Sequence, residues 1–177
     1  KEKQEAEELI DLSGLSSQAK GDIVEDRIKE LLLLHGQGLL NVYKPAVDTE
    51  GIDLIVVKNG QFHPIFIQSK GRYTLHNDKS MILRVKVKTF NAHPNYYVVG
   101  AFFDPKELEL ADRIFLIPSK EIVKKAGTVN SKYGEWYNIV ASLDPNSKNK
   151  WADYLIDKTK LAEKLIEKFT EIEEYIK

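Results

Sequence analysis

The feature that most constrains the fold is a pair of apolar runs around an Asn-Gly dipeptide. Residues 52–57 and 62–67 form the two runs, and Asn59-Gly60 lies in the segment between them. An Asn-Gly pair between apolar runs is a strong hairpin signal, because both residues tolerate the positive φ angles of the turn. We therefore predict an antiparallel β-hairpin over residues 51–70.

Polar residues stand at the open end of this hairpin. Asp53 lies at the start of the first run, and Gln68 and Lys70 follow the second run. Counting outwards from the turn makes Asp53 and Gln68 near neighbours across the two strands. Side chains alternate along a strand, so Gln68, Lys70 and Arg72 should project to one face of the sheet. Ser69 should face the other side.

A helix is predicted before the hairpin. Ser16 or Ser17 can cap its start, and His35-Gly36 ends it. Glu25 borders the apolar stripe of this helix, so its carboxylate could reach whatever the helix packs against. We expect the helix to pack on the face that carries Gln68, which brings two carboxylates, an amide and an amine into a small volume. The stripe consists of Val24, Ile28, Leu31 and Leu32.

The rest of the chain predicts further strands and two terminal helices. Residues 80–87 alternate between apolar and basic side chains, which favours a strand, although a helix through Leu83, Val87 and Phe90 is an alternative. Ser119 is expected to cap a short helix that Gly127 ends. The other predicted elements are a helix over 2–11, strands over 39–47, 95–104 and 113–118, a turn or short helix over 88–94, a largely irregular segment over 128–149 with a possible strand at 135–141, and a helix over 149–176.

This order of elements predicts an α/β (α+β) fold, in which helices flank a central mixed β-sheet. The 177 residues suffice for one domain, 1–177. Within it we expect an N-terminal helical extension over 1–14 and a long C-terminal helix over 149–177. That last helix packs on its own domain or on a second copy, so a homodimer is open.

Composition excludes several kinds of site. The chain has no cysteine, which rules out disulfides, zinc–thiolate centres and a cysteine nucleophile, and fits a cytoplasmic location. The four histidines lack the spacing of a helical metal site. No apolar run has the length of a membrane span, so no membrane partner is expected. The net charge is −1, so a nucleic-acid binder of this composition has to concentrate its basic residues locally.

The polar group at the hairpin end has the composition of a divalent-cation site. The carboxylates of Glu25 and Asp53, the amide oxygen of Gln68 and the carbonyl of Ser69 are hard oxygen donors, which suit Mg²⁺ or Mn²⁺. Lys70 beside them can polarise a water molecule and offset negative charge on a phosphate. This combination of groups is suited to cleaving a phosphodiester.

Three short segments give the chain a resemblance to the PD-(D/E)xK nuclease superfamily: GDIVEDRI, GID and QSK, at residues 21–28, 51–53 and 68–70. The resemblance implies a restriction-endonuclease-like core and a metal-dependent DNA endonuclease of restriction, repair or recombination. Its catalytic residues would be Glu25, Asp53, Gln68 and Lys70. Most members have an acid at the position of Gln68, whereas the Mrr-like and Holliday-junction-resolvase-like branch has a QxK motif, as this chain does. Gln68 in place of an acid removes one negative charge from the metal site. The alternative is therefore a nucleic-acid-binding module that does not cleave.

Basic residues near the predicted site form a possible strip. Arg72 follows Lys70, and Arg84, Lys86 and Lys88 alternate along the predicted strand over 80–87 and just beyond it. They could neutralise the phosphates of DNA, with RNA as an open alternative, without reading its sequence. The competing interpretation is an edge strand that lysines protect against aggregation.

Overall fold

A mixed β-sheet is the centre of the computed structural model, which describes residues 10–47 and 50–177. β3 and β5 run parallel, whereas the other neighbouring strands in this sheet run antiparallel. This arrangement confirms the predicted α+β class with a mixed central sheet. The strands follow the order β1 (Leu40–Tyr43), β2 (Leu54–Lys58), β3 (Ile65–Arg72), β5 (Tyr96–Asp104), β7 (Arg113–Pro118) and β10 (Leu155–Asp157), and β6 (Glu109–Leu110) pairs with β5.

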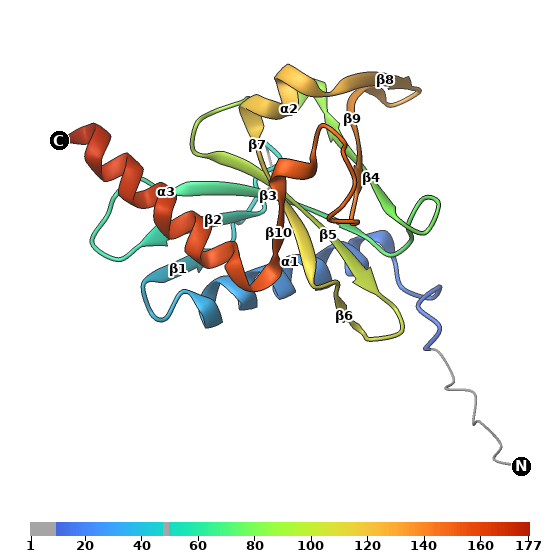
Figure 1. Cartoon of the computed structure of the whole chain (residues 1–177), viewed down its shortest axis with the longest axis horizontal. Helices are drawn as coiled ribbons and strands as arrows, with labels where there is room; N and C mark the ends of the chain where they lie inside the picture. The colour runs from blue at the N-terminus through green and yellow to red at the C-terminus, as the bar shows by residue number, and fades with distance from the viewer. Residues whose placement is uncertain (1–9, 48–49) are drawn as a thin grey trace, which may run out of the picture.

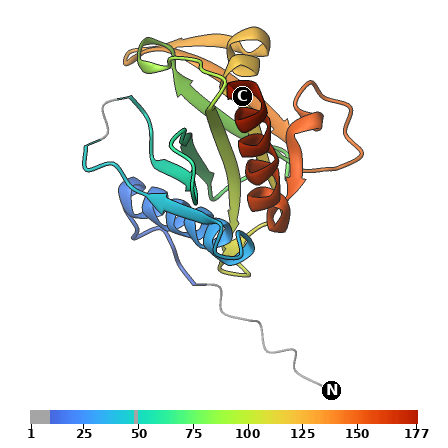
Figure 2. The ribbon, with the colours of Figure 1, turned by 90° about the vertical axis from the view of Figure 1, so that its left-hand side faces the viewer.

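Different layers cover the two faces of the central sheet (Figure 1 and Figure 2). The helices α1 (Ser17–His35) and α3 (Leu161–Ile176) pack on one face, where their apolar residues join those of β2 and β3 in one buried cluster. The other face packs against a second sheet and α2 (Ser119–Lys125). This second sheet has the order β4 (Ser80–Lys86), β9 (Gly134–Ser142) and β8 (Gly127–Ser131).

The predicted helix over residues 16–34 is present as α1. Ser16 is its N-cap, and its Oγ accepts a hydrogen bond from the backbone N–H of Ala19 at 3.1 Å. The apolar stripe faces the sheet: Val24, Ile28 and Leu32 are fully buried. The helix approaches β3 closely at Gly71, where a Cβ atom would lie 2.5 Å from a methyl carbon of Val24. Gly71 therefore allows α1 to pack against the last residues of β3.

The predicted hairpin is also present, since β2 and β3 pair antiparallel with a turn at Asn59-Gly60. The strand predicted over 39–47 is shorter and ends before Pro45. The strand interpretation of residues 80–87 is confirmed for 80–86, and Val87–Thr89 form a 3₁₀ helix. The strands predicted over 95–104 and 113–118 appear as β5 and β7.

The predicted start of the C-terminal helix is wrong. α3 begins at Leu161, and residues 152–160 instead form two 3₁₀ turns, Ala152–Tyr154 and Lys158–Lys160, on either side of β10. Leu155 pairs with Phe115 of β7, so its apolar side chain belongs to a strand. Asp157 Oδ1 accepts a hydrogen bond from the Thr159 backbone N–H, which is a local turn that competes with a helix at this point.

Other boundaries differ from prediction as well. The segment 128–149 contains the β8–β9 hairpin, of which only one strand was anticipated. Ser119 is not a cap: its buried hydroxyl donates to the carbonyl oxygen of His93 at 2.8 Å and accepts from the His93 N–H at 2.9 Å. Gly127 begins β8, and α2 ends at Lys125. Residues 1–9 of the predicted N-terminal extension lie outside the described residues, and residues 10–14 are not helical.

Neither α1 nor α3 has the combination of length and apolar character that a membrane span requires, and the same holds for every other helix within residues 10–47 and 50–177.

Candidate functional site

β3 extends beyond the end of its neighbour β2 in the central sheet. β2 pairs with β3 only at residues 65–67, whereas β3 continues beside β5 to Arg72. Residues 68–72 of β3 therefore run past the end of the β2 ladder. The backbone N–H groups of alternate residues on this side need a partner other than β2.

Asp53 supplies such a partner. Its backbone N–H donates to the carbonyl oxygen of Ile67 at 2.8 Å, which brings Asp53 level with the end of the ladder. Its carboxylate Oδ2 accepts a hydrogen bond from the backbone N–H of Ser69 at 2.6 Å. The expected proximity of Asp53 and Gln68 is confirmed, because Ser69 follows Gln68 directly. The Ser69 carbonyl points to the same edge as its N–H, as is usual in a strand.

Gln68 is held in place from two sides. It is only 9% exposed, and its Oε1 lies 3.4 Å from the hydroxyl of Tyr96 on β5. The same hydroxyl lies 3.2 Å from the carbonyl oxygen of Gly51. Gly51 has a φ of +72°, and a Cβ atom there would lie 2.6 Å from Nε2 of Gln68. A residue other than glycine would therefore displace the Gln68 amide.

The two faces of β3 can be assigned from these contacts. Gly71 faces α1, whereas Gln68 contacts Tyr96 in the core of the other face. The guanidinium of Arg72 reaches the second sheet, where its Nε donates to the carbonyl oxygen of Ile82 at 2.7 Å. Alternation places the side chain of Lys70 between those of Gln68 and Arg72. The prediction that these three residues share a face is confirmed for Gln68 and Arg72 by their contacts.

The expectation that α1 packs on the face carrying Gln68 is wrong. α1 covers the opposite face, because its Val24 packs onto Gly71. Glu25 lies at the border of that face with a 17% exposed side chain, and its Oε1 forms an ion pair with Lys44 Nζ at 3.0 Å. Glu25 is thus paired with a residue that follows β1. The sequence pattern identified the helix but could not assign the face, and Lys44 had no distinguishing signal.

Lys44 also joins the neighbouring acid of α1. Its Nζ lies 2.7 Å from Oδ1 of Asp26, and this hydrogen bond lowers the pKa of Asp26 below its usual range. The hydrogen bond to Asp26 is also the main cause that raises the pKa of Lys44, and the bond to Glu25 adds to it. Lys44 therefore remains a cation at neutral pH and holds the two carboxylates together.

A hollow of about 330 Å³ lies between the first turns of α1 and the last residues of β3. Lys20 and Gly21 of α1 and Ser69, Lys70 and Arg72 of β3 are among the residues that line it. Burial lowers the pKa of Arg72, and the positive charge of Arg84 adds to this effect. Ser69, whose N–H binds the Asp53 carboxylate, therefore lies beside this hollow.

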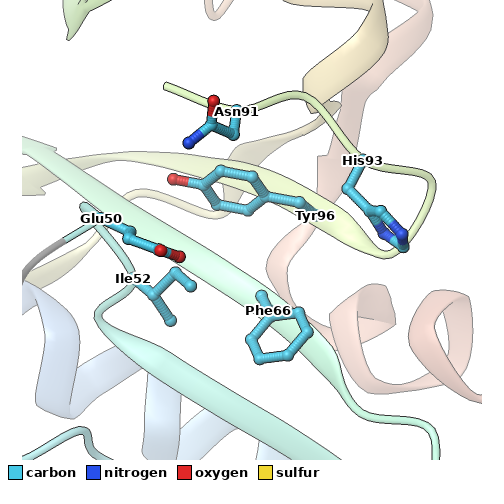
Figure 3. Close-up of a pocket in the computed structure, with 6 residues that line it drawn as sticks. All are labelled: Glu50, Ile52, Phe66, Asn91, His93 and Tyr96. Atoms are coloured by element: carbon cyan, nitrogen blue, oxygen red, sulfur yellow. The ribbon is translucent and has the colours of Figure 1, made fainter. Parts of the chain in front are cut away.

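A second pocket, of about 300 Å³, adjoins the site on the face of Gln68 (Figure 3). Ile52, Phe66 and the ring of Tyr96 form its apolar part, and Glu50, Asn91 and His93 lie at its rim. The Tyr96 hydroxyl, which reaches Gln68, belongs to this pocket too. Tyr96 is a residue that sequence reasoning missed, since its apolar run predicted only a core strand.

The oxygen donors near the open edge are of the kind that Mg²⁺ binds. Mg²⁺ binds proteins through one or two carboxylates and keeps several waters, so it does not need a full set of protein ligands. Asp53 provides a carboxylate held by Ser69, and Gln68 and Ser69 provide neutral oxygens. Within residues 10–47 and 50–177, however, no three His, Cys, Asp or Glu side chains come together as a metal-binding group. The donor set therefore carries less negative charge than a site of three acids.

Two cations of the predicted strip, Arg84 and Lys86, lie on the second sheet and not on a strand that pairs with β3. Arg84 and Lys86 belong to β4, where Arg84 is exposed. Lys88 lies in the following 3₁₀ helix, so the strand alternation that placed it with Arg84 and Lys86 ends before it. Arg72 connects the two sheets through Ile82.

The Tyr96 hydroxyl gives a first test of how the site is held. We expect Tyr96→Phe to lower the free energy of unfolding by about 1 kcal/mol. The reason is that the carbonyl oxygen of Gly51 and the amide oxygen of Gln68 lose the hydroxyl that donates to them. The side-chain amide resonances of Gln68 should shift in an NMR spectrum of the labelled protein. Tyr175→Phe, at a 93% exposed position, is the matched control. Unchanged urea denaturation and unchanged Gln68 resonances would show that Tyr96 does not hold Gln68.

The fold is similar to that of a known enzyme. The bacterial homing endonuclease I-Ssp6803I superposes with a TM-score of 0.57 at 17% sequence identity, over 92% of this chain and 99% of that chain. At this identity the similarity is one of fold. No protein-family model matches the sequence, and no curated protein matches it.

Proposed function

We propose that the chain is a metal-dependent endonuclease of the PD-(D/E)xK superfamily, in the Mrr-like and Holliday-junction-resolvase-like branch with a QxK motif, and that it hydrolyses phosphodiester bonds in DNA. The observation that carries this proposal is the 2.6 Å hydrogen bond from the Ser69 N–H to Asp53, which fixes a carboxylate beside Gln68 at an open sheet edge. The shared fold with a homing endonuclease supports it.

Each residue at the edge would have its own role in metal binding or catalysis. Asp53, the amide oxygen of Gln68 and the carbonyl of Ser69 would hold Mg²⁺ or Mn²⁺. The ion, when bound, activates water and neutralises charge on the phosphate. Tyr96 orients the amide of Gln68, and the Ser69 N–H orients the carboxylate of Asp53. Lys70, two residues beyond Gln68, holds the attacking water and offsets the charge that develops on the phosphate.

Glu25 remains a predicted ligand within this proposal. Its carboxylate is paired with Lys44 on the helix side of the sheet, so it reaches the edge only by exchanging this partner. Arg72 has a structural part as well, since two of its nitrogen atoms donate to the carbonyl oxygens of Ile82 and Gly71. Arg84, Lys86 and Lys88 are left as the predicted cations for the DNA backbone.

A binding module without turnover is the second candidate. The donor set has Gln68 in place of an acid, and within the described ranges no group of three acids or histidines forms. A site with so little charge binds divalent cations weakly. This candidate predicts salt-sensitive binding of nucleic acid with no cleavage. RNA as a ligand, a homodimer through α3 and a cytoplasmic location remain predictions.

The test of the proposed function is cleavage by the purified chain. Supercoiled, linear and branched DNA and a structured RNA are incubated with the protein in Mg²⁺ or Mn²⁺, and in EDTA. We expect cleavage of at least one DNA form that depends on the metal. DNA that stays intact in all metal conditions, but is still bound, would favour the binding module over the endonuclease.

A further inference from the structure

The second sheet has an outer face that its register defines. Met81, Leu83 and Val85 of β4, with Ile139 and Ala141 of β9, point inwards to the core. The alternate residues therefore point outwards, and the pairing sets Arg84 opposite Asn138 and Lys86 opposite Trp136. We call the outward positions of β4, β9 and β8 the outer face.

The outer face is basic. Arg84 and Lys86 are its charged residues, and no outward position of the three strands is acidic, since Glu135 of β9 alternates to the other side. Neither cation has an ion pair with an acidic residue of the described part of the chain. By contrast, Lys160, just before α3, and Lys164 and Lys168 on α3 each pair with a glutamate three residues later. The positive charge of the outer face is thus not compensated locally.

Trp136 is fixed on this face. Its indole N–H donates to Oγ of Ser131 on β8 at 3.1 Å, and Nζ of Lys86 lies over its ring, 5.9 Å from the centroid. Single-stranded nucleic acids bind through aromatic rings whose faces are open for base stacking. Because Nζ of Lys86 lies over one face of the Trp136 ring, a positioned cation takes the place of a stacked base there. That arrangement suits the phosphates of a duplex.

The outer face also connects to the proposed cleavage site. The hydrogen bond from Arg72 to Ile82 ties β4 to the last residue of β3. The charge of Arg84 is near enough to Arg72 to contribute to its altered pKa. Cationic groups therefore continue from Lys70 through Arg72 to Arg84 and Lys86.

We propose that the outer face of the second sheet docks the phosphate backbone of duplex DNA next to the cleavage site, with Arg84 and Lys86 as the contacting cations and Trp136 as the residue that positions Lys86. This inference rests on the proposed function and specifies the form of its substrate. Contacts of this kind are independent of base sequence and depend on salt, because each phosphate that is neutralised releases counterions.

The test is the salt dependence of binding by the full chain in EDTA, measured by fluorescence anisotropy with a labelled duplex and one of its single strands. We expect Arg84→Ala/Lys86→Ala to weaken duplex binding and to reduce the slope of log K against log salt by about two, one for each lost phosphate contact. Lys160→Ala/Lys164→Ala removes the same charge from α3 and the turn before it, and should leave the slope unchanged. Trp136→Phe, which removes the indole N–H, should weaken duplex binding less than the double variant.

Equal losses in the two double variants would show that net charge alone matters, and would overturn the docking surface. So would an unchanged slope in Arg84→Ala/Lys86→Ala, or tighter binding of the single strand than of the duplex. If the wild-type chain cleaves DNA but Arg84→Ala/Lys86→Ala has the wild-type slope, the docking surface is refuted and the proposed function stands. A chain that binds as expected but never cleaves supports the docking surface and refutes the endonuclease. Circular dichroism checks that each variant is folded.

Discussion

Replacing Lys70 by alanine is expected to lower DNA cleavage by about 10²- to 10⁴-fold, the range typical for loss of a group that moves a proton or stabilises charge in a transition state. Lys70 follows Gln68 by two residues on β3 and is among the residues that line the hollow beside Ser69. In the proposed mechanism its ammonium group holds the attacking water and offsets charge on the phosphate. The measurement is the single-turnover rate at saturating protein.

Binding of DNA should change far less in Lys70→Ala, because the proposed docking cations Arg84 and Lys86 remain. Lys164→Ala, on the distant helix α3, is the matched control for loss of one lysine. The non-catalytic binding module predicts equal rates for Lys70→Ala and wild type, at the background level. A rate in Lys70→Ala within a factor of about two of a truly active wild type would remove Lys70 from the catalytic group.

The second large effect is expected for Asp53→Asn. The amide keeps an oxygen that can accept the hydrogen bond from the Ser69 N–H, so the sheet edge should be preserved. The change removes the charge of the carboxylate that accepts the Ser69 N–H at this edge. Divalent cations depend on such charge, so cleavage should fall by about 100-fold or more and should recover in part at higher metal concentration.

Asp153→Asn, at an exposed position of the 3₁₀ turn Ala152–Tyr154, is the matched control and should cleave as wild type does. The free energy of unfolding is measured for both variants to separate a lost charge from a lost fold. If Asp53→Asn retains full activity at low metal concentration, Asp53 does not hold the ion. The proposal would then lose its central residue.

Local patterns in the sequence were sufficient for the elements that form this site. The Asn59-Gly60 turn sets the register of β2 against β3, and register alone brings Asp53 level with Gln68. The start of α1 was predictable because Ser16 caps it with a local hydrogen bond. Both features depend on residues that are close in sequence, so they can be recognised from one sequence alone.

The positions of elements relative to one another were harder to predict. The face of the sheet that α1 covers depends on the approach of Val24 to Gly71, a contact between distant segments. The wrong choice of face led to the expectation that Glu25 joins Gln68, whereas Glu25 pairs with Lys44. Periodicity indicates that a helix has an apolar side and leaves open which surface receives it.

The second sheet shows the same limit. Arg84 and Lys86 were expected on a strand beside Lys70, but β4 pairs with β9 and contacts β3 at its end through Arg72. Residues 127–142 have short apolar stretches and little periodicity, so the β8–β9 hairpin was only partly predicted. Trp136, which the docking surface needs, lies in this hairpin.

The central claim is that Asp53 and Gln68 hold a divalent ion at the open edge of β3. Crystals soaked in Mn²⁺ test it most directly, through an anomalous difference map. The account predicts a peak within bonding distance of the Asp53 carboxylate and the Gln68 amide oxygen, and no such peak in Asp53→Asn crystals. A map in which this edge stays empty at Mn²⁺ concentrations that support cleavage, or in which Mn²⁺ binds elsewhere, would contradict the account.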